Sequence, residues 1–374
     1  MLLYLTADQV GIQSGGGVVT QNESTALLDL AVERGEEFVC WDRKVLEGSG
    51  EDPWKWDEQA YNKIDETWRV MAGTGSARPG SALLEEKGEF YSPFSLCHVY
   101  AGTFSKTVNL LKKNGCKVTY TAAAHDISLS QREHERLGLK FDYPHLTDAA
   151  LWDRYVEGYR TASTIICPSN HSAECMRRYG CERTIVIPHG VDIPESQPRY
   201  QPPRTHKFVV GYLGAVGPDK GLLYLLQAWK QLAWQDAVLV LGGPHSDSPF
   251  VRALLQQYGG GNIHLLGWVE DLSYFYASLD LYIQPSVTEG FGIEVLEAMA
   301  HGRAVLCSRG AGAVDVLPEA WNFRPADVHR LAEAIHDMRK RDLQMIGQIN
   351  RELAREYEWP LIRKRYQKVW ESLL

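Results

Sequence analysis

The sequence predicts an α/β protein that consists of two doubly wound, Rossmann-like domains facing each other across a cleft. Short apolar runs alternate with longer amphipathic stretches, which is the pattern of parallel strands joined by helices. The pattern stops at a proline-rich stretch near the middle of the chain and then starts again. In addition, 374 residues are more than one hydrophobic core usually supports, so two domains are expected.

The first half carries five short runs rich in β-branched and apolar residues, each typical of a buried strand. These runs are residues 2–6, 38–41, 96–99, 117–121 and 164–167. The amphipathic stretches between them, for example residues 19–31 and 172–179, predict helices on both faces of a parallel sheet. Residues 42–90 do not fit this pattern, and we interpret them as an insertion in which three tryptophans form a small cluster.

A linker is predicted at residues 193–206, because this polar stretch contains four prolines and no apolar period. We therefore expect an N-terminal domain at residues 1–192 and a C-terminal domain at residues 207–356. The amphipathic end of the chain, about residues 357–374, is expected to return to the first domain as a helix.

The second half repeats the strand–helix pattern more cleanly. Its predicted strands are residues 207–214, 237–243, 263–269, 281–286 and 304–308, and helices are predicted at residues 222–232 and 250–258. Doubly wound sheets bind ligands in the crevice at the carboxyl ends of their strands. We therefore expect the functional residues of both domains at these ends.

The net charge and the apolar content of the chain limit the kinds of binding partner and location that we expect. The formal net charge of −8 argues against a nucleic-acid partner, which would need a basic face. No run of eighteen or more apolar residues is present, so no membrane span is predicted. The N-terminal MLLYLT reads as a strand and not as a signal peptide, which favours a cytoplasmic location. Peripheral contact with the inner face of the membrane stays open, because a local basic patch could still bind anionic lipid.

The seven cysteines are scattered and suit buried thiols in a reducing compartment. His171, Cys175 and Cys181 contain metal-ligating groups, but side chains on or beside one helix explain them better, so no metal site is predicted.

The densest functional signal is the segment PSVTEGFGIEVLEAMAHG at residues 285–302. A strand leads into a glycine-bearing turn and then into a helix. Free N–H groups and the helix dipole favour an anion at such a helix start. Glu289 lies in the turn, and Glu297 lies eight residues later, about 12 Å along the axis if helical. The turn residues that offer N–H groups or close approach are Gly290, Phe291, Gly292 and Ile293.

This segment resembles the Glu-x7-Glu signature of the retaining glycosyltransferases of family four, which have the GT-B fold. The resemblance implies that Glu289 faces the donor sugar and that Glu297 hydrogen-bonds the ribose hydroxyls. It also implies that the amides of residues 291–293 hold the distal phosphate of a nucleoside diphosphate.

Further segments resemble the same family in the same order, so the resemblance covers most of the chain. It implies that residues 1–192 form an acceptor domain and that residues 207–356 form a nucleotide-sugar donor domain. GPDKGL resembles its phosphate-binding loop, with Lys220 as the lysine. LVLGG, ending at Gly243, resembles the glycine turn at the nucleotide, and GWV at residues 267–269 resembles the backbone beside the base. In VIPHGVD, His189 replaces the asparagine that the family carries in an architectural turn.

Two segments of the first domain allow two interpretations each. SGGGVV opens a helix after the first strand, and Gly16 and Gly17 could bind the donor phosphate through their backbone or form a plain tight turn. AAAHD ends the fourth predicted strand, and His125 could donate a hydrogen bond into the cleft or be a structural histidine. For His125 the resemblance favours the functional interpretation, and it implies catalytic roles for His125, Glu289 and Lys220. The glycine cluster alone is weak evidence.

The chain departs from the family at Ala215, five residues before the lysine, where the family usually carries an arginine. A methyl group cannot replace a guanidinium that binds phosphate with two hydrogen bonds. Arg309 or a residue of the first domain is a candidate to supply the missing charge.

The resemblance implies a retaining, metal-independent glycosyltransferase of the hexosyl type, which moves a sugar from a nucleoside-diphosphate sugar to an acceptor hydroxyl. No cofactor is expected beyond the donor substrate, and the acceptor is a carbohydrate or a lipid-linked molecule. Two alternatives stay open. Ala215 motivates a sugar-nucleotide-binding protein with little turnover. Residues 14–17 suggest a dinucleotide-dependent oxidoreductase, although the Gly-x-Gly-x-x-Gly pattern is not met.

Overall fold

The computed structural model describes residues 1–6, 15–41, 60, 94–100, 105–141, 149–195, 208–244 and 248–374. The predicted insertion at residues 42–90 and the predicted linker at residues 193–206 lie almost entirely outside the described residues.

The first domain contains a six-stranded parallel sheet with strand order β2-β1-β3-β4-β5-β6. Its strands are β1 (Leu2–Thr6), β2 (Phe38–Trp41), β3 (Leu96–Tyr100), β4 (Lys117–Thr121), β5 (Thr164–Cys167) and β6 (Thr184–Val186). Its helices include α1 (Gly15–Arg34), α3 (Ser105–Lys113), α4 (Ile127–Arg136), α6 (Ala149–Thr161) and α7 (Asn170–Arg178). Strand β6 was not predicted, because this three-residue edge strand is only partly covered and lacks a continuous apolar run.

The second domain contains another six-stranded parallel sheet, with order β12-β11-β10-β7-β8-β9. Its strands are β7 (Phe208–Leu213), β8 (Ala237–Gly242), β9 (Ile263–Gly267), β10 (Leu281–Gln284), β11 (Ala304–Ser308) and β12 (Asn322–Phe323). Its helices include η1 (Pro218–Lys220), α8 (Leu222–Leu232), α9 (Pro249–Tyr258), α10 (Leu272–Ser278), α11 (Ile293–Ala300), α12 (Val328–Arg339) and α13 (Leu343–Ala354). The prediction of two doubly wound parallel sheets is therefore confirmed.

The strand order of the second sheet reverses at one point. From β7 the chain builds outward through β8 and β9, and it then crosses to the other side to add β10, β11 and β12. The order therefore reverses between β7 and β10, and in doubly wound sheets ligands usually bind at the carboxyl ends of such a pair of strands.

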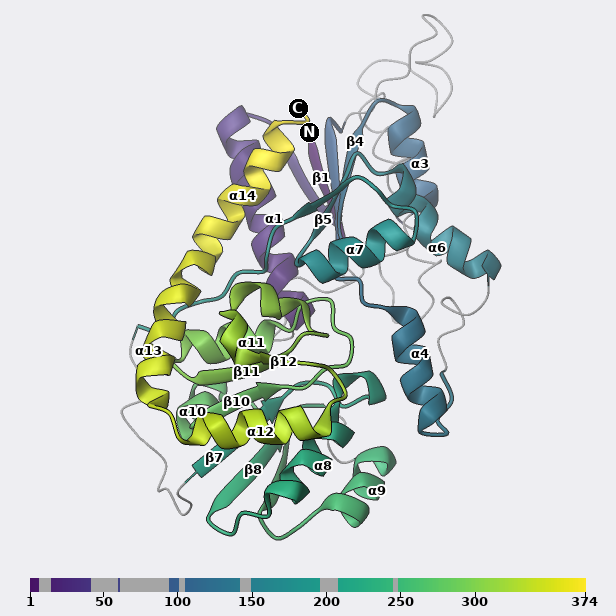
Figure 1. The fold of residues 1–374 in the computed structure, drawn as a ribbon. Helices are drawn as coiled ribbons and strands as arrows, with labels where there is room; N and C mark the ends of the chain where they lie inside the picture. Colours follow the sequence, from purple (N-terminus) through teal and green to yellow (C-terminus); the bar gives the residue numbers. More distant parts are fainter. Residues whose placement is uncertain are drawn as a thin grey trace, which may run out of the picture.

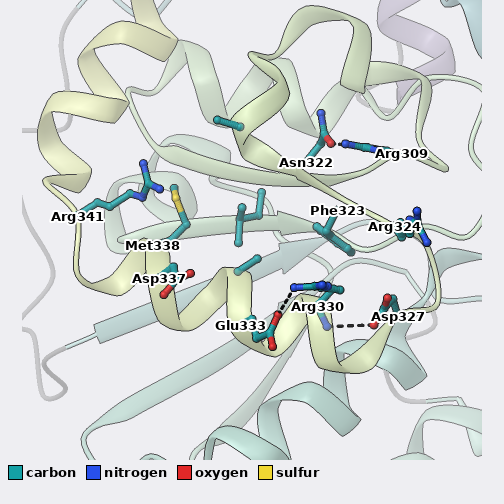
Figure 2. A pocket seen from close by; sticks show the side chains of 13 residues that line it. Arg309, Asn322, Phe323, Arg324, Asp327, Arg330, Glu333, Asp337, Met338 and Arg341 are labelled. Atoms are coloured by element: carbon teal, nitrogen blue, oxygen red, sulfur yellow. Dashed lines mark hydrogen bonds and ion pairs between the residues drawn. The ribbon is translucent and has the colours of Figure 1, made fainter.

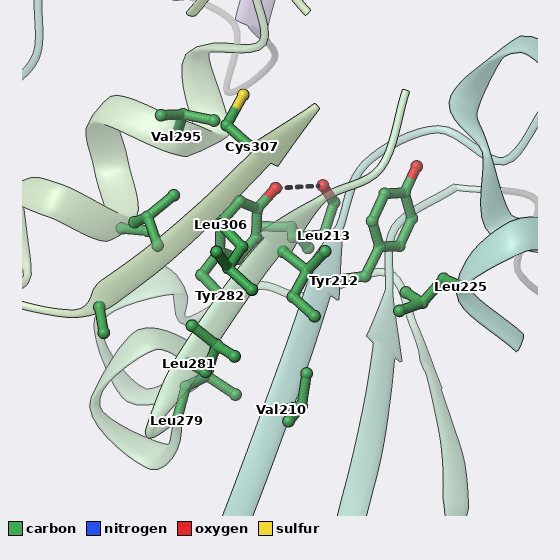
Figure 3. Close-up of a cluster of buried hydrophobic side chains, with 14 of the residues drawn as sticks. Val210, Tyr212, Leu213, Leu225, Leu279, Leu281, Tyr282, Val295, Leu306 and Cys307 are labelled. Carbon is green, nitrogen blue, oxygen red and sulfur yellow. Dashed lines mark hydrogen bonds between the residues drawn. The ribbon is translucent and has the colours of Figure 1, made fainter. Parts of the chain in front are cut away.

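The core of the second domain carries tyrosines as well as aliphatic side chains (Figure 3). Tyr282 is fully buried, and its hydroxyl donates to the carbonyl oxygen of Leu213 at 3.0 Å. The hydroxyl of Tyr212 donates to the carbonyl oxygen of Ala215 at 2.7 Å. Because both carbonyls lie at the end of β7 or just beyond it, these two tyrosines fix the turn that follows the strand.

The C-terminal helix α14 (Trp359–Glu371) lies along α1 on the first domain (Figure 1). Trp370 is fully buried there, and its Nε1–H donates to Thr119 Oγ1 at 3.2 Å. Arg363 donates to Asn22 Oδ1 at 3.2 Å. Within the described residues, no helix has the length and apolar content that crossing a membrane requires.

Candidate active site

Two turns of the second domain bring Lys220 and Glu289 together. Lys220 ends η1, after β7, and Glu289 lies in the turn after β10. The Lys220 ammonium donates to Glu289 Oε2 and lies 3.8 Å from Asp219 Oδ2. Burial alone would lower the pKa of Lys220, but the carboxylates of Glu289 and Asp219 outweigh burial and raise it. The ammonium is therefore charged throughout the physiological range of pH.

The two turns are also joined through their backbones. The N–H of Val287 donates to the carbonyl oxygen of Asp219 at 2.7 Å, which holds the lysine loop against the glutamate turn. On the other side, the N–H of Glu289 donates to the carbonyl oxygen of Gly310 at 2.9 Å. Because its backbone is held on both sides, the position of the Glu289 carboxylate is well defined.

The start of α11 carries backbone N–H groups that could bind an anion. Gly292 precedes the helix with a left-handed φ of 94°, and Ile293 is its first residue. Within the described residues, no acceptor is bonded to the backbone N–H groups of Phe291, Gly292 or Ile293. Unpaired N–H groups at a helix N-terminus attract a phosphate or carboxylate. The side chain of Phe291 is buried, and its ring centroid lies 5.1 Å from that of His189.

Glu297 lies one to two turns into α11 and is held by a hydrogen bond from a neighbouring helix. The hydroxyl of Tyr276 donates to Glu297 Oε2 at 2.8 Å. Burial raises the pKa of Glu297, and the hydrogen bond from Tyr276 opposes that rise. Because Tyr276 uses only Oε2, the other carboxyl oxygen is an acceptor that a ligand hydroxyl can use.

His125 of the first domain reaches the same cluster. Burial and then the positive charge of Lys220 lower the pKa of His125, against the opposing charges of Asp219 and Glu289. The imidazole is therefore neutral at pH 7 and can donate or accept one hydrogen bond. Its turn is fixed by Tyr179, whose hydroxyl donates to the carbonyl oxygen of His125 at 2.9 Å.

Contacts between the domains surround this cluster. The N–H of Asp126 donates to Thr288 Oγ1 at 2.9 Å, and Ser169 Oγ donates to the carbonyl oxygen of Gly290 at 2.7 Å. Both contacts join residues after strands of the first sheet to the turn after β10. The carboxyl ends of the two sheets therefore meet where His125, Lys220 and Glu289 lie.

Gly243 lies directly after β8, with a φ of 124°. A Cβ atom there would lie 2.7 Å from the carbonyl carbon of Gly214, so only glycine lets the two turns pack this closely. Gly16 and Gly17 fall in the first turn of α1, and residues 7–14 lie outside the described ones. A donor-binding role of these three glycines stays a prediction.

Sequence reasoning missed His171 as a residue of this region. Its Nε2 lies 3.2 Å from Thr288 Oγ1, and Cys175 Sγ lies 3.8 Å from the same nitrogen. Burial lowers the pKa of His171. The sequence signal that could have identified His171 was its position as the second residue of α7, just after the carboxyl end of β5. Among the described residues, no group of three or more His, Cys, Asp or Glu side chains is arranged to hold a metal ion.

His189 and Arg309 lie outside the cluster. His189 is buried, its Nδ1 has no partner among the described residues, and burial lowers its pKa to about 4. Figure 2 shows Arg309 at a separate cavity of about 450 Å³ beside α12, and none of the other predicted site residues lines this cavity. Arg309 donates to Asn322 Oδ1 at 2.6 Å and pairs with Glu319, so the suggestion that it supplies charge beside Lys220 gains no support.

The chain is similar to known proteins. Residues 207–341 match the family model of glycosyl transferases group 1. The sulfoquinovosyl transferase SQD2 of Arabidopsis thaliana is 29% identical over 191 residues, which cover 46% of this chain and 36% of that protein. The chain thus spans about a third of the length of this relative.

Two solved structures resemble the whole chain. The sucrose-phosphate synthase of Thermosynechococcus elongatus has a TM-score of 0.72 at 19% identity, covering 100% of this chain and 98% of that one. Anabaena HepE in complex with UDP and glucose has a TM-score of 0.65 at 19% identity, covering 100% of both chains. Together with the two parallel sheets, these similarities show that the chain has the GT-B fold.

Proposed function

We propose that the protein is a retaining, metal-independent glycosyltransferase of the hexosyl type, which moves a sugar from a nucleoside-diphosphate sugar to an acceptor hydroxyl. The observation that carries this proposal is the Lys220–Glu289 pair beside the unpaired N-terminus of α11, with His125 of the other domain close enough for both charges to act on its pKa. The match to glycosyl transferases group 1 covers Lys220, Glu289 and α11, but not His125.

The donor diphosphate would lie between Lys220 and the N–H groups of Phe291, Gly292 and Ile293. The ammonium and the helix start both favour the negative charge that grows on the phosphate as it leaves. These groups supply positive charge from the protein itself, which is why the proposal requires no divalent metal. Glu297 would accept hydrogen bonds from the ribose hydroxyls.

In the transfer step, the bond between the anomeric carbon and the diphosphate oxygen breaks. The acceptor oxygen bonds to the same carbon from the same face of the ring, which preserves the anomeric configuration. The proton of the acceptor hydroxyl passes to the departing phosphate oxygen, so charge and atoms balance. Neutral His125 would orient the sugar or the acceptor by a hydrogen bond, and Glu289 would accept one from a sugar hydroxyl.

The acceptor would be a carbohydrate or a lipid-linked molecule, and the protein would act in the cytoplasm, with peripheral contact at the inner membrane face when the acceptor is lipid-linked. The proposal leaves the nucleoside of the donor undecided between uridine and other nucleosides. Since the solved HepE structure is a complex with UDP and glucose, UDP-sugars are the first donors to test.

A panel of UDP-, GDP- and ADP-sugars tests the proposal, with release of nucleoside diphosphate as the measurement. We expect one donor to be consumed, and Lys220→Ala to slow release about 100-fold or more. Lys230→Ala is the matched control, because Lys230 lies on the exposed face of α8 in the same domain. Release by Lys220→Ala at the control rate, or no release from any donor by the natural chain, would contradict the proposal.

A sugar-nucleotide-binding protein with little turnover is the second candidate, and Ala215 favours it. Without the arginine, less positive charge faces the diphosphate in the transition state. The same panel separates the two functions, since a binding protein would be thermally stabilised by a nucleoside diphosphate yet release none from any donor.

A further inference from the structure

A buried contact between the two domains lies apart from the candidate active site and joins α4 of the first domain to α8 of the second. The hydroxyl of Tyr224, the third residue of α8, donates to Glu133 Oε2 on α4 at 2.8 Å. Leu137, which caps the C-terminus of α4, packs against the hydrophobic core of the second domain. The far end of α4 is therefore docked on the second domain by a hydrogen bond and by apolar contact.

Arg136, three residues after Glu133, holds both partners of this hydrogen bond. Its Nε and Nη2 donate to Glu133 Oε2 at 3.3 and 3.0 Å. Its guanidinium carbon lies 5.1 Å from the centroid of the Tyr224 ring, within the range of a cation–π contact. Burial, and then the hydrogen bond to Glu133, raise the pKa of Tyr224. The phenol therefore keeps the proton that it donates across the domain junction.

The two helices that meet in this contact each begin next to a residue of the candidate site. Helix α4 begins two residues after His125, and α8 begins two residues after Lys220. Between Lys220 and α8 lies Gly221, where a Cβ atom would lie 2.7 Å from the carbonyl carbon of Pro285. The start of α8 is therefore packed closely against the turn after β10, so a helix that is fixed to Tyr224 is also fixed relative to that turn.

Helix α4 is thus attached to the second domain at two points. At its start, the N–H of the N-cap residue Asp126 donates to Thr288 Oγ1 at 2.9 Å. The second point is Glu133, about 9 Å along the helix axis from the first helical residue. A helix that is held at one point can still turn about that point, whereas a helix held at two points has a fixed direction. The direction of α4 in turn sets where His125 lies relative to the second domain.

We propose that Glu133 and Tyr224 are positioning residues for the proposed transfer. Their hydrogen bond clamps α4 to α8 and so holds His125 in place beside Lys220. Both residues act through the direction of α4 and not through contact with the substrate, and Arg136 keeps the carboxylate in the orientation that accepts the bond. The inference rests on the proposed function, because it assumes that His125 orients the donor sugar or the acceptor.

The variant Tyr224→Phe tests this inference, because it removes the hydroxyl and keeps the ring. The measurements are kcat for release of nucleoside diphosphate, with the donor that the natural chain consumes in the panel, and calorimetry with UDP, GDP and ADP. Loss of one hydrogen bond to a carboxylate should lower kcat about tenfold. The dissociation constant of the nucleotide should stay the same, because Lys220 and α11 both belong to the second domain. Tyr258→Phe is the matched control and should keep the natural kcat, since the Tyr258 hydroxyl accepts from Gln227 within the second domain.

Variants of Glu133 complete the test. Glu133→Gln keeps an acceptor oxygen and should retain more of the natural kcat than Glu133→Ala. The double variant Tyr224→Phe/Glu133→Ala should be no slower than the slower of the two single variants, because both changes remove the same bond. An unchanged kcat in Tyr224→Phe, losses that multiply in the double variant, or an equal loss of kcat and nucleotide affinity overturns the inference alone. If the natural chain releases nucleoside diphosphate from no donor, the proposed function falls with it.

Discussion

Gly290 is a position at which one added methyl group should strongly affect the proposed reaction, because it lies at the contact between the two domains. It lies between Glu289 and the start of α11, against the backbone of Ala123 in the first domain. A Cβ atom at Gly290 would lie 2.6 Å from the carbonyl carbon of Ala123, where ordinary contact begins at 3.4 Å. The difference is 0.8 Å, and the atoms that the new methyl group meets are backbone. The carbonyl oxygen of Ala123 lies closer still, so the turn of Glu289 and the first domain must separate by at least this distance, two residues from His125.

Gly290→Ala should reduce transfer about 100-fold, because a displacement of about 1 Å between reacting groups can cost that much. Binding of nucleoside diphosphate should change little, since Lys220 and α11 belong to one domain. Gly261→Ala is the matched control, as nothing lies within 4 Å of a Cβ atom there. The assay is kcat/KM with the donor found in the panel, alongside calorimetry with the nucleotide. Equal kcat/KM in the two variants would refute the role of this contact.

Three further outcomes are expected. Glu297→Ala should weaken nucleotide binding by about 1.5–3 kcal/mol through loss of a charged hydrogen bond to ribose. The control is Glu333→Ala, at an exposed residue, whose affinity should not change. If calorimetry shows unchanged affinity for Glu297→Ala as well, the assignment of Glu297 is wrong. Transfer should survive EDTA, and loss that manganese or magnesium restores would show a metal requirement. The folded pKa of His189, about 4, lies below its unfolded value of 6.5, so its contribution to stability falls as pH drops from 6.5 towards 4. The free energy of unfolding should fall between pH 7 and pH 4.5 by about 2–3 kcal/mol less in His189→Asn than in the natural chain. Urea unfolding that shows the same pH dependence in both proteins would rule this out.

The sequence predicts long, buried elements well and short or edge elements poorly. Strands such as β7 and β8 are continuous apolar runs, because helices cover both faces of the sheet. Strand β12 has two residues, and β6 lies at an edge, so neither builds a periodic signal. Strands β12 and β6 form because they pair with a neighbouring strand in the folded chain, and that pairing is not visible in the sequence pattern.

The candidate site shows the same division between local and tertiary information. The turn, the glycines and Glu289 belong to one short segment, so spacing alone indicates an anion site at a helix start. Lys220 lies on a different turn, 69 residues away in the chain, and only the folded structure shows that its ammonium donates to Glu289.

The contacts between the domains were the least accessible to sequence reasoning. Ser169 and Thr288 are small polar residues in loops, where such residues are common for many reasons. Thr288 nevertheless accepts from the N–H of Asp126, and Ser169 donates to the carbonyl oxygen of Gly290, so each fixes a functional turn from the opposite domain. Because these bonds join backbone to side chain across the junction, they position His125 and Glu289 without contacting either side chain. Changes at these two loop residues should therefore alter the alignment of the site while leaving each domain intact.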